Sequence, residues 1–215
     1  MPEFDTNLQF SVSAQNLCCQ RDDHPVFSNL NFNVKSGEAL FLHGQNGSGK
    51  STLLLAISGL LPFEGDLSFG RTKIQEEQTP IGHHIHFIST LNAMKSELTL
   101  AENLRFWCLT LGGQTRSIPQ ALEKAGLGGL DNFLAGHLST GQKHRLSLAR
   151  LLAIDRPIWL LDEPSSALDS AGDEWVAALI DEHLAKKGLV ITATHRPINL
   201  NNKSTAKTLN LGSKP

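Results

Sequence analysis

The segment GQNGSGKST, residues 44–52, constrains the fold of this chain more than any other feature. It follows an apolar run, residues 39–42, that predicts a strand, and it leads into STLLLAISGL, which predicts a helix ending at Gly59. Glycines let backbone N–H groups curve around an anion, and a helix N-terminus adds partial positive charge. The pattern G-x-x-x-x-G-K-S/T between a strand and a helix therefore predicts a phosphate-binding loop. Its members are Gly44, Gln45, Asn46, Gly47, Ser48, Gly49, Lys50, Ser51 and Thr52.

Residues elsewhere in the chain fit the other requirements of a nucleoside triphosphate site. Lys50 is expected to reach the β- and γ-phosphates, and Ser51 to ligate Mg²⁺. The apolar run IWLL delivers Asp162, a second candidate for holding Mg²⁺, to the carboxyl edge of a parallel sheet. Glu163 follows directly and points elsewhere, toward the place of an attacking water that it could deprotonate. His195 ends the apolar run LVITATH, where a neutral imidazole can bond the γ-phosphate.

The stretch LSTGQ, residues 138–142, predicts a second helix start that can bind an anion. Ser139 and Gln142 form an S-x-x-Q capping box, so a helix is expected from Ser139 through KHRLSLARLL. Gly141 leaves the first turn open to close approach. Because the first loop already holds the phosphates, this second start is redundant within one chain. The second helix start would have a use if it closed over the nucleotide bound by another copy of the chain. This predicts a homodimer.

Apolar runs separated by helices predict an α/β fold whose parallel sheet is covered on both faces. The clearest strands are PIWLLDEP and LVITATH, and Thr99 with Glu102 marks the start of a helix over residues 97–112. We expect a further short helix in SIPQALEKAGL. Loosely alternating sequence predicts short strands in residues 8–19 and 26–34 that form an antiparallel edge sheet. We expect short strands and turns in residues 62–88 and a last strand near 208–211.

Composition narrows the class of protein. The 215 residues carry 19 basic and 21 acidic side chains, a balance that gives no support for broad attraction to nucleic acid. Three cysteines without a C-x-x-C pattern indicate a reducing compartment. The sequence shows no signal-peptide pattern and no apolar run long enough to cross a membrane, so we expect a protein that is soluble or peripheral to a membrane.

The motifs GQNGSGKST, LSTGQ, LLDEPSSALD and ATH, in this order and spacing, resemble those of the ATP-binding cassette (ABC) nucleotide-binding domain. The resemblance covers nearly the whole chain. It implies one P-loop domain over residues 1–215, with an antiparallel β subdomain and a helical lobe inserted at about 89–150. It also implies a head-to-tail dimer with two ATP molecules at its interface, where Ser139 and Gly141 contact the γ-phosphate in the opposite subunit. SALD, ending at Asp169, would be the D-loop that crosses the dimer axis.

A closer resemblance lies in ELTLAENLRFW, LSTGQKHRLSLARLL and THRPINL, which are similar to the haem-exporter ATP-binding subunit of cytochrome c maturation. That family implies ATP hydrolysis tied to haem delivery, with membrane permease subunits as partners at the cytoplasmic face of the bacterial inner membrane. The alternatives are an exporter cassette for another cargo, a soluble regulatory ABC ATPase and a P-loop small-molecule kinase. The single P-loop argues against the regulatory class, and LSTGQ with Glu163 argues against the kinase.

The chain departs from the ABC pattern at three positions. Thr90 stands where most cassettes have the glutamine of the Q-loop, and Thr140 where the signature usually has glycine. The chain has no tyrosine, and Arg21 falls where an aromatic side chain normally stacks on adenine. The guanidinium plane of Arg21 can stack on a base, which makes it the adenine candidate.

Three further features invite a functional interpretation that we do not adopt. In HHIH, His84 and His86 would share one face of a strand and His83 the other, which is a weak ligand set for a metal. Adjacent Cys18 and Cys19 would point apart on a strand. The basic run of residues 143–145 is interpreted as a solvated helix face.

Overall fold

The computed structural model describes residues 11–21, 24–70, 72–73, 83–91 and 93–212. The strands of this part are β1 (Ser11–Arg21), β2 (His24–Lys35), β3 (Ala39–His43), β4 (Glu64–Phe69), β5 (Thr72–Lys73), β6 (Ile85–Ile88), β7 (Ile158–Asp162), β8 (Leu189–Ala193) and β9 (Ala206–Asn210). Its α-helices are α1 (Lys50–Ile57), α2 (Leu100–Leu111), α3 (Ile118–Lys124), α4 (Thr140–Ala153) and α5 (Ser170–Ala185). Short 3₁₀ turns lie at Thr115–Ser117, Ala135–His137 and Lys203–Thr205.

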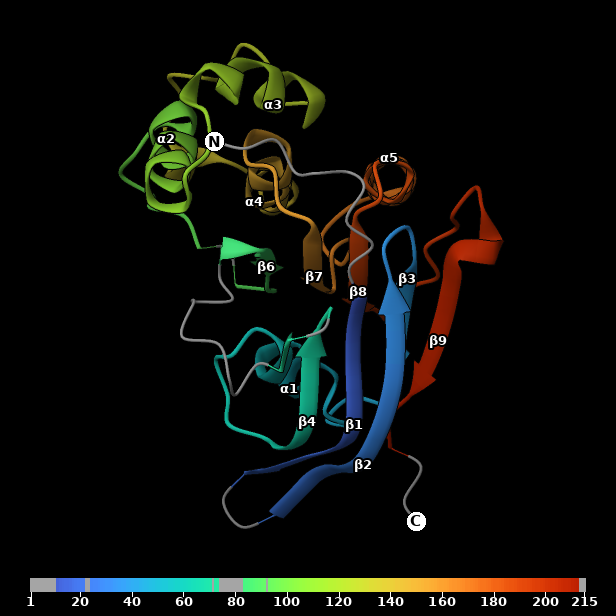
Figure 1. Cartoon of the computed structure of the whole chain (residues 1–215). Helices are drawn as coiled ribbons and strands as arrows, with labels where there is room; N and C mark the ends of the chain where they lie inside the picture. The colour runs from blue at the N-terminus through green and yellow to red at the C-terminus, as the bar shows by residue number, and fades with distance from the viewer. Residues whose placement is uncertain (1–10, 22–23, 71, 74–82, 92, 213–215) are drawn as a thin grey trace.

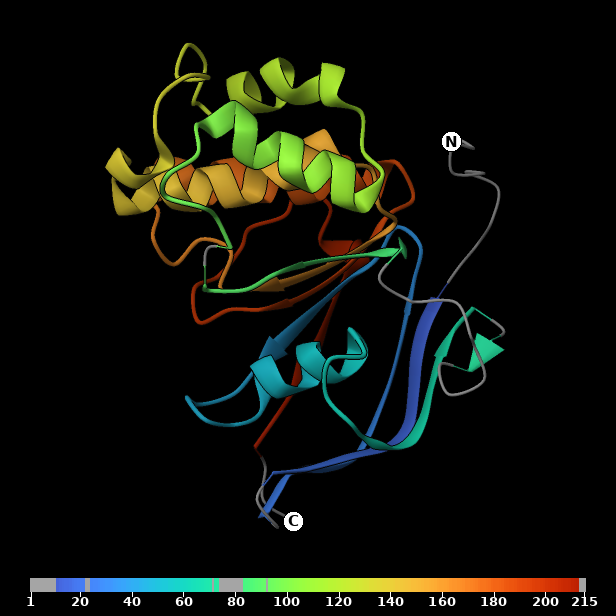
Figure 2. The same ribbon diagram turned by 90° about the vertical axis from the view of Figure 1, so that its left-hand side faces the viewer.

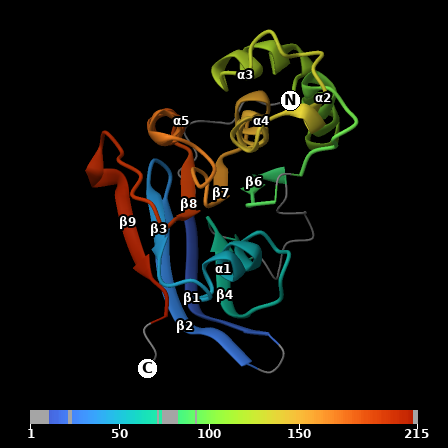
Figure 3. The ribbon, with the colours of Figure 1, turned by 180° about the vertical axis from the view of Figure 1, so that it is seen from behind.

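The strands form two sheets. A five-stranded parallel sheet has the order β6-β7-β8-β3-β9, and a four-stranded antiparallel sheet has the order β2-β1-β4-β5. The antiparallel strands thus form a sheet of their own, which confirms the predicted antiparallel subdomain. Figure 1 shows the parallel sheet between a helical layer and the long strands β1 and β2. From behind, β9 lies on the outer side of β3, as its register with β3 requires (Figure 3).

Alternate side chains of the parallel strands enter different cores, because successive residues point to opposite faces. Ile158 and Leu160 of β7 join the cluster that packs α1 between the two sheets, whereas Trp159 and Leu161 join the cluster under α4 and α5. Figure 2 shows α1 on one side of the sheet and the larger helices on the other. Both faces of the parallel sheet are covered. This explains why β7 and β8 are apolar along their whole length instead of alternating between apolar and polar residues.

The helices α2, α3 and α4 pack around a third apolar cluster, which includes Leu104, Leu122 and Leu146. The Thr99 capping box is formed: the Glu102 amide donates to Thr99 Oγ1 at 3.2 Å, and Glu102 Oε2 accepts from the Thr99 amide at 2.8 Å. The predicted helices at 97–112 and in SIPQALEKAGL are therefore confirmed, with slightly shorter bounds. None of the described helices is long and apolar enough to cross a membrane.

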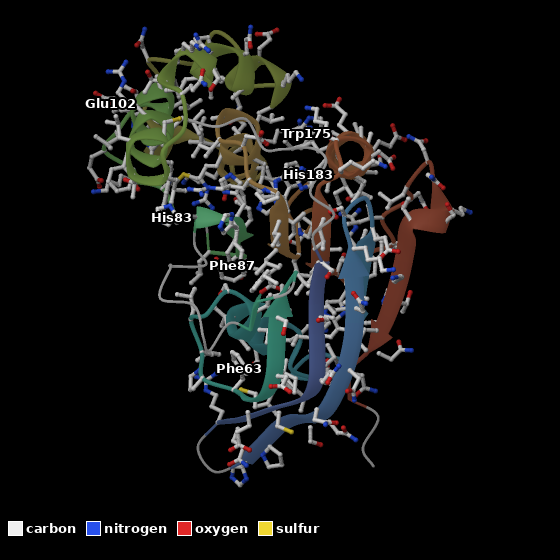
Figure 4. All side chains as sticks on the ribbon, viewed as in Figure 1. Phe63, His83, Phe87, Glu102, Trp175 and His183 are labelled. Carbon is white, nitrogen blue, oxygen red and sulfur yellow. The ribbon has the colours of Figure 1, made fainter. Side chains whose placement is uncertain are left out.

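The prediction that residues 143–145 form a solvated helix face is wrong. His144 is buried, and its Nε2 donates to the Pro164 carbonyl at 2.7 Å. Arg145 stacks on the ring of Trp175, which Figure 4 labels on α5. The charge pattern misled because α4 is covered on several sides by α2, α3 and the sheet, so its polar residues also lie inside.

The strand that was expected to hold His84 and His86 begins one residue after His84. His84 and His83 are exposed before β6, and His86 is buried within it, with its Nε2 2.9 Å from the Ile154 carbonyl. The described residues contain no group of three His, Cys, Asp or Glu side chains that could hold a metal. Cys18 and Cys19 differ in burial, as side chains that point apart on β1 should. Residues 8–10 and most of 71–82 fall outside the described part.

Candidate functional site

The loop between β3 and α1 is shaped for an anion. Gly49 precedes α1 with φ +96°, a left-handed conformation, and a Cβ there would lie 2.8 Å from Val26 Cγ1. Only glycine tolerates both constraints. No side chain caps the start of α1, and its first turn carries no acidic residue. The N–H groups and positive end of the helix dipole are therefore available to a negatively charged ligand.

Lys50 at the start of α1 is buried to 7% exposure and points back into this loop. Its Nζ donates to the carbonyls of Gly44 at 2.8 Å and Gln45 at 3.1 Å. A buried ammonium held by neutral carbonyls has no anionic partner among the described residues. Phosphate oxygens would give it charge-assisted hydrogen bonds in place of these neutral ones.

The carboxyl ends of β7 and β8 face the same loop. Asp162 is the last residue of β7, and Glu163 follows it with φ +52°, which is uncommon for a residue with a side chain. The Glu163 amide donates to the Ala193 carbonyl of β8 at 2.8 Å. Glu163 thus leaves the extended conformation of the strand, and such local strain is typical of functional sites.

His195 lies two residues beyond the end of β8, next to Glu163. The His195 amide donates to Glu163 Oε2 at 3.3 Å, and its Nε2 is 3.6 Å from Glu163 Oε1. The Glu163 side chain is 17% exposed and the His195 side chain 46%. A shielded carboxylate thus lies beside an imidazole that a ligand can reach.

One pocket of about 490 Å³ gathers the predicted residues from distant parts of the sequence. That volume lies within the range of small-molecule sites. The lining comprises Arg21, Val26, Asn46, Gly47, Ser48, Gly49, Lys50, Ser51, Thr52, Thr90, Asp162, Glu163 and His195. Loop, acids and histidine therefore share one cavity at the carboxyl edge of the parallel sheet.

The donors in this pocket suit a hard divalent cation. The Ser51 hydroxyl and the Asp162 carboxylate line the same cavity, and Asp162 is only 7% exposed. Oxygen donors of this kind are what Mg²⁺ prefers, particularly with phosphate oxygens completing its shell. These two residues fit the Mg²⁺ role that their positions in the sequence predicted.

The rim of the pocket contains one residue that the sequence did not reveal. Val26, half-buried on β2, packs against Gly49 and lines the cavity beside Arg21. The ABC pattern has an aromatic side chain at the position of Arg21 and gives no signal at Val26. Thr90, at the Q-loop position, is exposed and also lines the pocket.

The signature residues do not line this pocket. Ser139, Gly141 and Gln142 lie at the start of α4, where Ser139 Oγ accepts from the Gln142 amide at 3.3 Å and Gln142 Oε1 accepts from the Ser139 amide at 2.9 Å. The predicted capping box is thus confirmed. Asp169 caps α5 by accepting from the Gly172 amide at 2.8 Å. The predicted contact of the signature with the nucleotide of another copy stays a prediction.

Comparison with known proteins identifies the family. Residues 27–166 match the family described as ABC transporter. The chain is 45% identical over 201 residues to the cytochrome c biogenesis ATP-binding export protein CcmA of Rhizobium etli, covering 91% of this chain and 93% of that protein. The chain belongs to the CcmA family of ABC transporter ATP-binding proteins. CcmA of Agrobacterium fabrum is 44% identical, covering 88% of this chain and 91% of the relative.

Solved structures agree with the ABC cassette fold. A putative ABC transporter ATP-binding protein from Pyrococcus furiosus has a TM-score of 0.79 and 26% identity, covering 93% of this chain and 97% of that one. The ABC cassette MJ1267 in its ADP conformation has a TM-score of 0.75 at 23% identity, covering 89% of this chain and 83% of that one, and supports the fold alone. The α/β cassette architecture predicted from the motifs is confirmed.

Proposed function

We propose that this chain is the ATP-binding and ATP-hydrolysing subunit of a membrane ABC transporter that energises haem export or delivery in cytochrome c biogenesis. The observation that carries the ATPase part is the pocket shared by Lys50, Asp162, Glu163 and His195. The haem part rests on the CcmA relatives, which are described as cytochrome c biogenesis ATP-binding export proteins.

The pocket residues have different roles in ATP hydrolysis. The loop amides and Lys50 bind the phosphates, while Ser51 and Asp162 would hold Mg²⁺, which would neutralise phosphate charge. Glu163 orients an attacking water and takes its proton. His195 contacts the γ-phosphate and adjoins the Glu163 carboxylate, so it senses the loss of that phosphate. Arg21 and Val26 border the place of the adenine ring.

Two copies are required for a complete site. Ser139 and Gly141 do not line the pocket of their own chain, and Ser139 is exposed at the start of α4. In a head-to-tail homodimer, each signature would close over the ATP of the other copy. The single cassette of residues 1–215, with its helical lobe at about 89–150, would be the repeating unit.

Exposed apolar side chains support a contact surface for the membrane permease subunits. Leu91 is 80% exposed and follows Thr90, while Leu109 and Phe106 on α2 are 72% and 42% exposed. Phe106 and Leu109 are three residues apart and share one face of α2, and apolar patches of this kind are typical of interaction sites. We place the permease contact on this surface, at the cytoplasmic face of the inner membrane, where Thr90 would relay the state of the nucleotide.

Copurification tests the assignment to haem transport. Tagged protein is isolated from its native membranes in mild detergent, and the associated proteins are identified by mass spectrometry. Haem-exporter membrane subunits are the expected partners. If a different permease copurified, the ATPase assignment would stand but haem would be rejected as the cargo. If no membrane protein copurified, a soluble regulatory ATPase would be favoured.

A further inference from the structure

The turn that follows Glu163 is held by its backbone carbonyls. His144 Nε2, on α4, donates to the Pro164 carbonyl at 2.7 Å. Arg196 Nη1 donates to the carbonyls of Ser165 at 3.2 Å and Leu168 at 3.0 Å. Residues 164–168, which include most of the D-loop, are therefore fixed from both sides by side chains of other segments.

The Arg196 side chain is itself anchored. Its Nη2 is 2.7 Å from Asp173 Oδ2 on α5, so one planar guanidinium binds two carbonyls and one carboxylate. Arg196 also directly follows His195, and its amide donates to Thr194 Oγ1 at 3.1 Å. Arg196 therefore connects the His195 loop with the 164–168 turn and with α5.

The other side of the turn touches the signature helix. A Cβ placed on Gly141 would lie 3.2 Å from the Ala167 carbonyl, and His144 is one helical turn further along α4. The His195 loop, the 164–168 turn and the LSTGQ helix start thus form one contiguous contact chain within a single copy.

We infer that Arg196 is a positioning residue that couples the two nucleotide sites of the dimer. This inference rests on the proposed function, in which each copy binds one ATP with its pocket and the other copy's ATP with its signature. Arg196 makes the His195 loop of the first site move together with the signature that serves the second. It lies outside the pocket lining, so its loss should spare binding of ATP to a single chain.

A role in stability alone makes a different prediction. The Arg196 and Asp173 side chains are 44% and 25% exposed, and ion pairs with this much solvent contact contribute little to folding. A stabilising contact would change the melting temperature but leave the cooperativity of the reaction intact. Cooperativity is therefore the readout that distinguishes positioning from stabilisation.

The test compares Arg196→Gln and Arg196→Lys with the charge-matched control Lys203→Gln, since Lys203 is exposed in the 3₁₀ turn before β9. The full chain is assayed in its membrane complex for kcat, KM and the Hill coefficient of ATP hydrolysis. Binding of a fluorescent ATP analogue to the isolated full chain gives the affinity of the single site. Arg196→Lys keeps the charge but lacks the planar fork.

We expect Arg196→Gln to lower kcat by about tenfold or more, as small misplacements of catalytic groups do. Its Hill coefficient should fall toward 1, while the affinity of the single chain stays within about twofold, since the pocket is untouched. Arg196→Lys should not rescue either loss, and Lys203→Gln should match the wild type. If both Arg196 variants kept the wild-type kcat and Hill coefficient, the inference about Arg196 would be overturned and the proposed function would stand. If the wild-type complex had no ATPase activity, the proposed function would be overturned.

Discussion

The Glu163 carboxylate and His195 form a pair at the end of the parallel sheet. The His195 amide nitrogen lies 3.3 Å from Glu163 Oε2, and the His195 imidazole Nε2 lies 3.6 Å from Glu163 Oε1. Glu163 reaches this position through a left-handed backbone conformation, φ +52°, that is held by a hydrogen bond to β8. A strained acidic residue next to a reachable imidazole is suited to orienting a water molecule for attack on a phosphate.

Replacing Glu163 by glutamine should abolish turnover and preserve ATP binding. The amide has nearly the shape of the carboxylate but cannot take a proton, so ATP hydrolysis should fall about 10²- to 10⁴-fold. Phosphate release by the membrane complex and binding of a fluorescent ATP analogue measure the two effects. The control is Glu174→Gln on the exposed face of α5, which should behave as the wild type. Unchanged turnover in Glu163→Gln would remove this residue from the mechanism.

Removing the Lys50 ammonium should weaken ATP binding itself. Charge-assisted hydrogen bonds contribute about 1.5–3 kcal/mol, so Lys50→Ala should bind ATP roughly ten- to a hundredfold more weakly. Equilibrium binding to the isolated chain measures this, with Lys203→Ala as the exposed control. If Lys50→Ala bound ATP with wild-type affinity, the loop between β3 and α1 would not be the phosphate site.

A charge on the proposed permease surface should release the membrane subunits. Leu109→Asp places a carboxylate on the exposed face of α2, and we expect it to lose most of the copurifying permease while ATP binding stays unchanged. Leu60→Asp is the matched control, because Leu60 is 64% exposed but lies just after α1 rather than on α2. Equal loss of permease in both variants, or in neither, would contradict the placement of this surface.

Acid should destabilise the fold through its buried histidines. Burial, with Arg150 and Arg156 nearby, lowers the pKa of His86 to about 3 despite its bond to the Ile154 carbonyl, and burial lowers the pKa of His183 to about 4. Figure 4 labels His183 on α5, where it stacks on Trp159. Both groups stay neutral in the folded protein, whereas the unfolded chain takes up protons below about pH 6.5.

Their stabilising contribution is therefore complete above pH 6.5 and is lost as the pH falls toward 4. Each histidine should add about 1.4 kcal/mol per pH unit to the slope of the unfolding free energy within that window. Urea unfolding between pH 7 and 5 measures this slope, and His86→Gln should reduce it by about one proton. A slope identical to that of the wild type would show that His86 is accessible to protons in the folded state.

Local motifs were enough to predict the nucleotide pocket. Residues 44–52, Asp162, Glu163 and His195 each follow a strand or begin a helix, and parallel strands bring such ends to one edge. Charge pattern was not enough for α4, because the buried His144 contacts the turn after β7, which lies next to it only after folding. Arg196 was also missed, since its partners Ser165, Leu168 and Asp173 are adjacent only after folding.

Complementation with the Glu163→Gln variant tests the central claim most directly. Cells that lack this chain receive the wild type or Glu163→Gln at equal expression, and their haem-containing c-type cytochromes are counted by haem staining. The account predicts that the wild type restores these cytochromes and that Glu163→Gln, though present at the membrane, does not. Full restoration by Glu163→Gln, or normal c-type cytochromes in cells without the chain, would contradict it.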